Sequence, residues 1–192
     1  MIKAVIFDCF GVLVAEGWKP FATRHFGEAS EGNERRKWAN SRMHQVSKGL
    51  LSHEALADEM TEAAGISREE FLGELQSNPS DQALLEYIKN ELKPHFKIGF
   101  LSNVGLNRMS ELFTKNELEL FDEVVLSFET GMAKPDKETY EHMANLLAVS
   151  PSDCIFVDDT SLYCTGAENV GMKPIFFTNT EQFKQDLAKL LQ

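Results

Sequence analysis

Cysteine is scarce in this sequence, and long apolar runs are absent. The three cysteines, Cys9, Cys154 and Cys164, are an odd number without CxxC or Cys/His spacing, which argues against a disulfide framework and against a structural zinc site. We therefore expect a reducing compartment. The first apolar stretch is too short for a secretory leader and ends on a carboxylate, Asp8, and no stretch approaches the length of a membrane span. The expected location is cytoplasmic.

Positive charge is also in short supply. The chain has 19 Lys and Arg against 30 Asp and Glu, a formal net charge of -11. Such a surface repels nucleic-acid phosphates and anionic membranes, so we expect neither as a partner, and an anionic substrate has to be bound locally. The 192 residues, 43% hydrophobic and 26% charged, suit a globular protein of one domain with room for an insertion. We expect a monomer or a weak homodimer that acts on a small molecule.

Short β-rich runs alternate with amphipathic stretches along most of the chain. Five runs are expected to form strands: 3–7, 97–101, 123–127, 154–157 and 173–177. Several are apolar without alternation, which is typical of strands covered on both faces. Helices are expected near 81–92, 105–116, 136–147, 161–170 and 180–191, with start signals at Pro135-Asp136 and at Thr180-Glu181. This alternation predicts an α/β fold with an open parallel sheet between helices.

The segment between Val14 and Asp81 departs from this alternation because it contains no convincing β run. Its helices are expected near 32–48, 52–64 and 68–76, and the last begins at the capping-box sequence Ser67-Arg68-Glu69-Glu70. An insertion of this length is too long for one crossover helix. We therefore expect a helical cap subdomain of residues 15–80 over one edge of a core domain formed by residues 1–14 and 81–192.

Polar residues follow four of the expected strands: Asp8 after the first, Ser102 and Asn103 after the second, Lys134 after the third, and Asp158 and Asp159 after the fourth. In a doubly wound sheet the reactive site lies where the chain leaves the carboxyl ends of the strands. The sequence therefore predicts that these six side chains converge on one crevice.

These residues, in this order, resemble the four motifs of the haloacid dehalogenase-like hydrolase superfamily. Motif one resembles Asp8 to Leu13, motif two Ser102, motif three Lys134, and motif four Asp158-Asp159. The flanking segment from Gly131 to Met172 is similar to the branch that includes β-phosphoglucomutase, sugar phosphatases and 2-haloacid dehalogenases. The resemblance implies a Rossmann-like doubly wound sheet of order 3-2-1-4-5, an all-helical cap inserted after the first strand, and a Mg²⁺-dependent hydrolase of a small phosphate ester.

The residue types fit distinct roles in such a site. Asp8 can attack phosphorus and form an aspartyl-phosphate, and Asp8 with Asp159 can ligate Mg²⁺ while Asp158 is a further ligand or an orienting group. Lys134 offers a positive charge, and Ser102 and Asn103 offer hydrogen bonds, to the phosphoryl oxygens. The plainer alternatives are a turn or capping aspartate for Asp8, a surface lysine for Lys134, a helix N-cap for Ser102-Asn103, and a solvated acidic face for Asp158-Asp159.

The pattern departs from the family at Phe10. Phosphatases of the family usually carry there an aspartate that protonates the leaving oxygen and later activates water. A positioned acid or base contributes about 10² to 10⁴ in rate, roughly 3 to 5.5 kcal/mol, so mutase chemistry is disfavoured. The metal of the family takes the backbone carbonyl at this position, which Phe10 can still provide.

Three functions therefore stay open. The first is a phosphatase whose substrate has a good leaving group or whose acid comes from the cap or from water. The second is a ligand-binding or regulatory protein with little turnover. The third is a metal-independent 2-haloacid dehalogenase, because motif one of those enzymes has an aromatic residue at the position of Phe10. However, the paired acids Asp158 and Asp159 would repel the carboxylate of such a substrate. Carbon-phosphorus cleavage would need a cap lysine, for which Lys19, Lys37 and Lys48 are available. The cap also offers side chains that could contact a substrate, none of which we assign: Trp18, Arg24, His25, Arg35, Arg36, Trp38 and Arg42.

Overall fold

The computed structural model describes residues 1–76, 79–105 and 107–191, and within them five parallel strands form one sheet. The strand order is β3-β2-β1-β4-β5, which confirms the expected fold. The strands are β1 (Ala4–Phe7), β2 (Lys97–Ser102), β3 (Glu123–Leu126), β4 (Cys154–Asp158) and β5 (Lys173–Phe176), each within one residue or so of its predicted range. Because Phe7 pairs in register with Phe100 and Val157, the three central strands end side by side.

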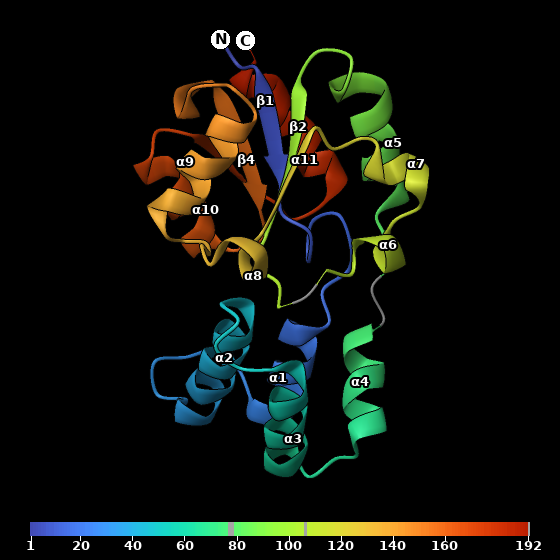
Figure 1. Ribbon diagram of the computed structural model, residues 1–192, viewed down its shortest axis with the longest axis vertical. Coiled ribbons are helices and arrows are strands. Elements are labelled where there is room, and N and C mark those ends of the chain that lie inside the picture. Colours follow the sequence, from blue (N-terminus) through green and yellow to red (C-terminus); the bar gives the residue numbers. More distant parts are fainter. Residues whose placement is uncertain (77–78, 106, 192) are drawn as a thin grey trace.

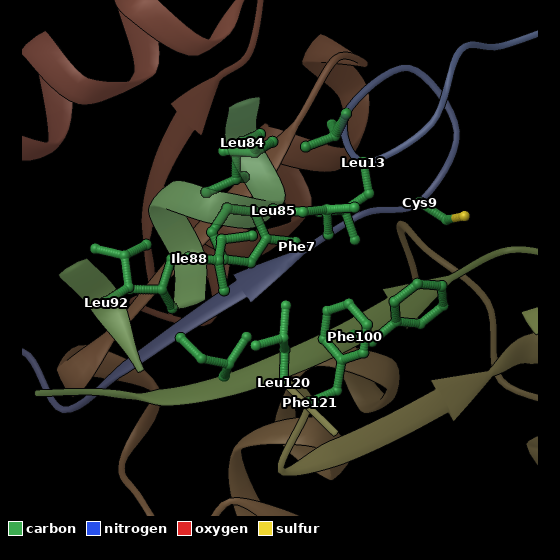
Figure 2. Close-up of a cluster of buried hydrophobic side chains, with 14 of the residues drawn as sticks. Phe7, Cys9, Leu13, Leu84, Leu85, Ile88, Leu92, Phe100, Leu120 and Phe121 are labelled. Carbon is green, nitrogen blue, oxygen red and sulfur yellow. The ribbon is translucent and has the colours of Figure 1, made fainter. Parts of the chain in front are cut away.

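Alternate side chains of the strands enter two hydrophobic clusters, one on each face of the sheet. Val5 and Phe7 pack under α5 (Gln82–Tyr87), the π-helical turn η1 (Ile88–Leu92) and α11 (Thr180–Leu190). Figure 2 shows Phe7 and Phe100 gathered with Leu85 and Ile88 in this cluster. Ala4 and Ile6 face the other way, toward α9 (Lys137–Leu146) and α10 (Ser161–Asn169). The period-2 alternation of β1 therefore joins both layers of helices to the central strand.

Four helices between β1 and α5 pack on one another around a third cluster. They are α1 (Trp18–Phe26), α2 (Glu34–Ser47), α3 (His53–Ala64) and α4 (Arg68–Gln76), and their buried side chains include Phe21, Leu56, Met60 and Phe71. In Figure 1 the strand arrows point toward these helices, and both termini lie at the opposite end of the molecule. We propose the division into a core of residues 1–14 and 81–192 and a cap of residues 15–80, and the separate cluster supports it.

Two contacts join α2 to the loops at the carboxyl end of the sheet. The Ser127 hydroxyl donates to the carbonyl oxygen of Ser47 over 2.5 Å, and the Lys48 ammonium lies 3.1 Å from a carboxylate oxygen of Asp136. Ser127 opens the short helix α8 (Ser127–Thr130), and Asp136 precedes α9. The C-terminal end of α2 therefore lies against the loops that carry the predicted site.

Two helix predictions need correction, and one further helix was not predicted. The helix expected over 105–116, of which residue 106 lies outside the described residues, is replaced by the single turns α6 (Met109–Leu112) and α7 (Lys115–Leu118). Phe113 between them is extended and buried against Phe100 and Phe121, and a capping box of Thr114 and Glu117 starts a new turn.

The helix α1 was not predicted, because Gly17 and Pro20 interrupt its pattern. The N-cap of α11 is Asn179, whose side chain accepts a hydrogen bond from the Gln182 amide, so α11 begins at Thr180 itself. The remaining described elements include the 3₁₀ turn η2 (Pro151–Asp153). No helix among the described residues has the length and apolarity that crossing a bilayer would require.

Candidate active site

The chain turns sharply after β1, directly behind Asp8. The amides of Val12, Leu13 and Val14 all approach the carbonyl oxygen of Cys9, and Gly11 has φ +89°. A Cβ atom at Gly11 would also overlap the carboxylate of Asp159. Only glycine accepts both conditions without strain, so the turn after β1 and the loop after β4 pack against each other without an intervening side chain.

Lys134 is the centre of the cluster, and its side chain is almost completely buried. Its ammonium lies 2.8 Å from Asp8 Oδ1 and 2.7 Å from Asp158 Oδ2, and it stands over the ring of Tyr163 at 4.9 Å from the centroid. The main chain of Lys134 is held by Asn103, whose amide oxygen accepts from the Lys134 amide and whose Nδ2 donates to the Lys134 carbonyl, both over 2.9 Å. The loop after β2 therefore positions the lysine that joins β1 to β4.

Three carboxylates gather at this point. One oxygen from each of Asp8, Asp158 and Asp159 lies within 4.8 Å of the other two. Asp158 is fully buried, and its second oxygen accepts from the Thr160 amide over 2.8 Å. Clustered carboxylate oxygens are the donors that Mg²⁺ prefers, so this donor set fits the expected cation. Asp158 already binds Lys134 and the Thr160 amide, and Asp159 likewise pairs with Lys19. Which of the three carboxylates would ligate the cation stays a prediction.

Burial and charge together perturb the buried pair. Burial lowers the pKa of Lys134, but the charges of Asp158 and Asp8 outweigh it, so that the pKa of Lys134 is raised and the ammonium keeps its proton. Burial raises the pKa of Asp158, the charge of Lys134 lowers it and the charge of Asp8 raises it, and the net result is a pKa of about 7. Both shifts express one fact: the cluster holds more negative charge than one lysine can balance in a dry site.

Of the predicted site residues, four form the cluster and Asn103 binds its lysine: the four are Asp8, Lys134, Asp158 and Asp159. Ser102 is buried at the end of β2, whereas both amide atoms of Asn103 already bind Lys134. Phe10 forms an isolated bridge with Val14, and its ring packs against the hydrophobic cluster under α5. The roles of Ser102 and Asn103 toward substrate, and of the Phe10 carbonyl toward a metal, stay predictions.

Two charged residues at the start of the cap join this cluster. The Lys19 ammonium pairs with Asp159 Oδ2 and lies 3.8 Å from Glu16 Oε2. Glu16 was not predicted to take part, and Lys19 was considered only as an amine nucleophile. Glu16 lies just before α1 and Lys19 lies on it. The sequence pattern did not reveal this helix, so the only available signal was the closeness of both residues to Asp8 along the chain.

The candidate cap side chains for substrate contact bind within the cap instead. Arg24 and His25 both pair with Glu74, and Arg42 pairs with Glu59. The remaining four candidates also contact cap residues. Trp18 donates a hydrogen bond to the Asn40 side chain, and Arg35 donates one to the Ala63 carbonyl. Arg36 donates one to the Thr23 hydroxyl, and Trp38 packs edge-on against Phe26. None of these contacts reaches the acidic cluster, which agrees with leaving the seven residues unassigned.

Comparison with known proteins places the chain in a family. A family model of haloacid dehalogenase-like hydrolases matches residues 2–171, so the chain belongs to this family and is a hydrolase.

Named relatives point to phosphatases. The Phosphatase MT3486 of Mycobacterium tuberculosis is 29% identical over 213 residues, covering 98% of this chain and 93% of the relative. The sesquiterpene phosphatase astK of Aspergillus oryzae is 25% identical, with coverage of 98% and 96%. Among solved structures, the fold is similar to a family enzyme, bt-2542 of Bacteroides thetaiotaomicron, crystallised with magnesium and inorganic phosphate, with a TM-score of 0.67, 21% identity and coverage of 93% and 95%.

Proposed function

We propose that the protein is a Mg²⁺-dependent phosphatase of a small phosphorylated metabolite. The observation that carries the proposal is the convergence of Asp8, Asp158 and Asp159 within 4.8 Å, with the buried Lys134 ammonium bound to two of them. The phosphatases among the relatives, and the magnesium and phosphate in a structure of similar fold, support the same reaction class.

In the proposed reaction Asp8 is the nucleophile. One oxygen of its carboxylate binds Lys134, and the second attacks the phosphorus in line. The new O–P bond gives an aspartyl-phosphate as the bond to the leaving oxygen breaks, and water then hydrolyses this ester and releases inorganic phosphate. Bound to Asp8 and Asp159, Mg²⁺ would neutralise the charge of the phosphoryl oxygens. Lys134 adds a fixed positive charge beside Asp8.

The alternatives are weaker. A haloacid dehalogenase would bring its substrate carboxylate to three carboxylates without a metal to offset them. Cleavage of a carbon-phosphorus bond needs a neutral lysine amine. Burial lowers the pKa of Lys19, but its hydrogen bond to Asp159 and the charge of Glu16 dominate and raise it, so the amine stays charged. A protein with little turnover would still bind Mg²⁺ but would cleave no ester in a broad panel.

Hydrolysis of p-nitrophenyl phosphate by the purified protein, with and without Mg²⁺, tests the proposal. We expect activity only with Mg²⁺, and a loss of about 10³-fold or more in kcat for Asp8→Asn, because the amide is not a nucleophile. Asp58→Asn, an exposed aspartate of the cap, is the matched control and should keep full activity. Equal turnover by Asp8→Asn, or in excess chelator, would refute the proposal. Chloride release from 2-chloropropionate without metal would favour the dehalogenase instead.

A further inference from the structure

Among the described residues of the acidic cluster, none is well placed to give a leaving group a proton. Asp158, whose pKa is raised to about 7, is fully buried and binds Lys134 and the Thr160 amide through its two oxygens, so it does not supply this proton. Phe10 has none to give. Lys134 is committed to two carboxylates. The Tyr163 hydroxyl lies behind Lys134, at 3.4 Å from Asn103 Nδ2, and burial raises its pKa. The Cys9 side chain belongs to the hydrophobic cluster and is 1% exposed. An alkoxide leaving group nevertheless needs a proton as its bond to phosphorus breaks.

Glu16 is a further acid that the structure links to the cluster, through Lys19. The Lys19 ammonium stands between the two carboxylates, in contact with Asp159 and 3.8 Å from Glu16. The side chains of Glu16 and Asp159 are each 18% exposed, so both lie at the boundary between the dry interior and solvent.

The backbone on both sides fixes the place of Glu16. Before it, Val14 is tied to the turn after β1, and the Ala15 amide donates to the Pro79 carbonyl over 2.9 Å. After it, a Cβ at Gly17 would come within 3.0 Å of the Glu74 carbonyl and of Leu75 in α4. Glu16 is therefore held between the turn that carries Asp8 and a close approach of two cap helices.

We propose that Glu16 is the general acid and base of the phosphatase reaction, an inference that rests on the proposed function. Its carboxyl group gives a proton to the leaving oxygen as the bond from that oxygen to phosphorus breaks, and an alcohol departs. The resulting carboxylate then takes a proton from water as the water oxygen attacks the aspartyl-phosphate. Inorganic phosphate leaves, Asp8 is regenerated, and Glu16 is protonated again.

The charges around Glu16 suit both halves of this cycle. Burial raises the pKa of Glu16 from 4.5 to about 7; Lys19 opposes this shift, whereas Asp159 and Asp8 increase it. Both protonation states are therefore populated near neutral pH, where a group can act in turn as acid and as base.

The leaving-group dependence of Glu16→Gln tests the inference, because the amide keeps the shape of the side chain and loses the proton. We expect kcat/KM for an alkyl phosphate to fall about 10² to 10⁴-fold. The loss for p-nitrophenyl phosphate, whose phenolate leaves without a proton, should stay within about tenfold. Across a series of substituted phenyl phosphates the variant should therefore depend more steeply on the pKa of the leaving group. The control Glu69→Gln, at an exposed site in α4, should change neither substrate.

Equal losses on alkyl and aryl phosphates, or no loss on either, would overturn the inference, because a purely structural role does not distinguish leaving groups. Loss of Mg²⁺ binding by calorimetry would also overturn it, since Glu16 would then be a metal ligand. If Glu16→Gln does not fold, Glu16→Asp, whose acid is one methylene shorter, should keep part of the activity on alkyl phosphates. Complete loss of that activity would count against Glu16 as the general acid.

The same assays separate the inference from the proposed function. Full activity of Asp8→Asn would overturn both. An inactive Asp8→Asn beside an unaffected Glu16→Gln would remove the inference alone.

Discussion

Lys134 shows how a single residue holds the site together. A buried ammonium with two carboxylates loses much hydration energy, and removing one member of such a group costs more than its net contribution to stability. In the sequence, its position after a predicted strand was what distinguished Lys134, as a candidate site residue, from the other lysines. Its complete burial between Asp8 and Asp158 explains why a lysine serves here: the site needs a compact positive charge on a long apolar stem.

Glu16 carries a stability prediction that does not depend on catalysis. Its pKa is about 7 in the folded protein, against 4.5 for the free group, so the folded state binds the proton more tightly than the unfolded state. The stability of the wild-type protein therefore falls relative to Glu16→Gln as pH rises from about 4.5 to 7, by up to roughly 3 kcal/mol, and then levels off. Urea unfolding of both proteins at pH 5 and pH 8, in the presence of chelator, measures this difference. A wild-type-to-variant difference that is constant with pH would contradict it, and Glu69→Gln should show such a constant difference.

The residues foreseen from the sequence and those that were missed differ in one physical respect. Asp8 and Asp158 lie at the carboxyl ends of β1 and β4, and Lys134 lies in the segment after β3. Parallel strands of one sheet bring their carboxyl ends together whatever the rest of the chain does. Lys19 comes to the cluster on α1, and Glu16 lies just before this helix, where Gly17 packs closely against α4. Such packing depends on contacts between segments distant in sequence, which no local pattern expresses.

At the scale of elements, the junction of the turn after β1 with the loop after β4 decides whether the cation site can form. Gly11→Ala would press a methyl group into the Asp159 carboxylate and would also strain a residue of φ +89°. We expect Mg²⁺ affinity, measured by calorimetry, to fall about tenfold or more, because a displaced ligand costs at least about 1.4 kcal/mol of binding.

Gly171→Ala is the matched control for this element. Gly171 has φ +92°, and nothing lies within 4 Å of the Cβ that alanine would add. The control should therefore lose about 1 to 2 kcal/mol of stability from backbone strain alone and should keep its affinity for Mg²⁺. Equal affinities of Gly11→Ala and the wild type would show that Asp159 is not a ligand or that its loop yields freely.

Elements also show where local and tertiary forces compete. The five strands were predictable, because β-branched and aromatic runs between turn residues admit few other structures. The stretch after β2 looked like one helix, but burial of Phe113 against Phe100 and Phe121 extends the chain at that point. The Thr114 capping box then restarts the helix. Burial of a large aromatic side chain can outweigh helix propensities of a few tenths of a kcal/mol per residue.

At the scale of the whole molecule, the acidic cluster links folding to the cation. Strands β1 and β4 both end in it, so any unfolding of the sheet separates the carboxylates. The Mg²⁺ proposed for this cluster would therefore bind the folded chain in preference to the unfolded one. The chain as a whole carries a net charge of -11, which adds to the repulsion that the cation relieves.

Mg²⁺ should therefore raise the unfolding temperature. A ligand at 100 times its Kd adds about 2.7 kcal/mol to the stability of the form that binds it, which in a chain of this size corresponds to roughly 5 to 10 °C. A thermal melt followed by circular dichroism over a range of Mg²⁺ concentrations measures the shift. Asp159→Asn should melt at or above the temperature of the metal-free wild type, because it removes one of the mutually repelling carboxylates, and it should lose most of the response to Mg²⁺. Asp159 also pairs with Lys19. A variant that melts well below the metal-free wild type would therefore mean that this ion pair stabilises the protein more than the carboxylate repulsion destabilises it. A Mg²⁺-dependent shift that survives in the variant would place the cation elsewhere.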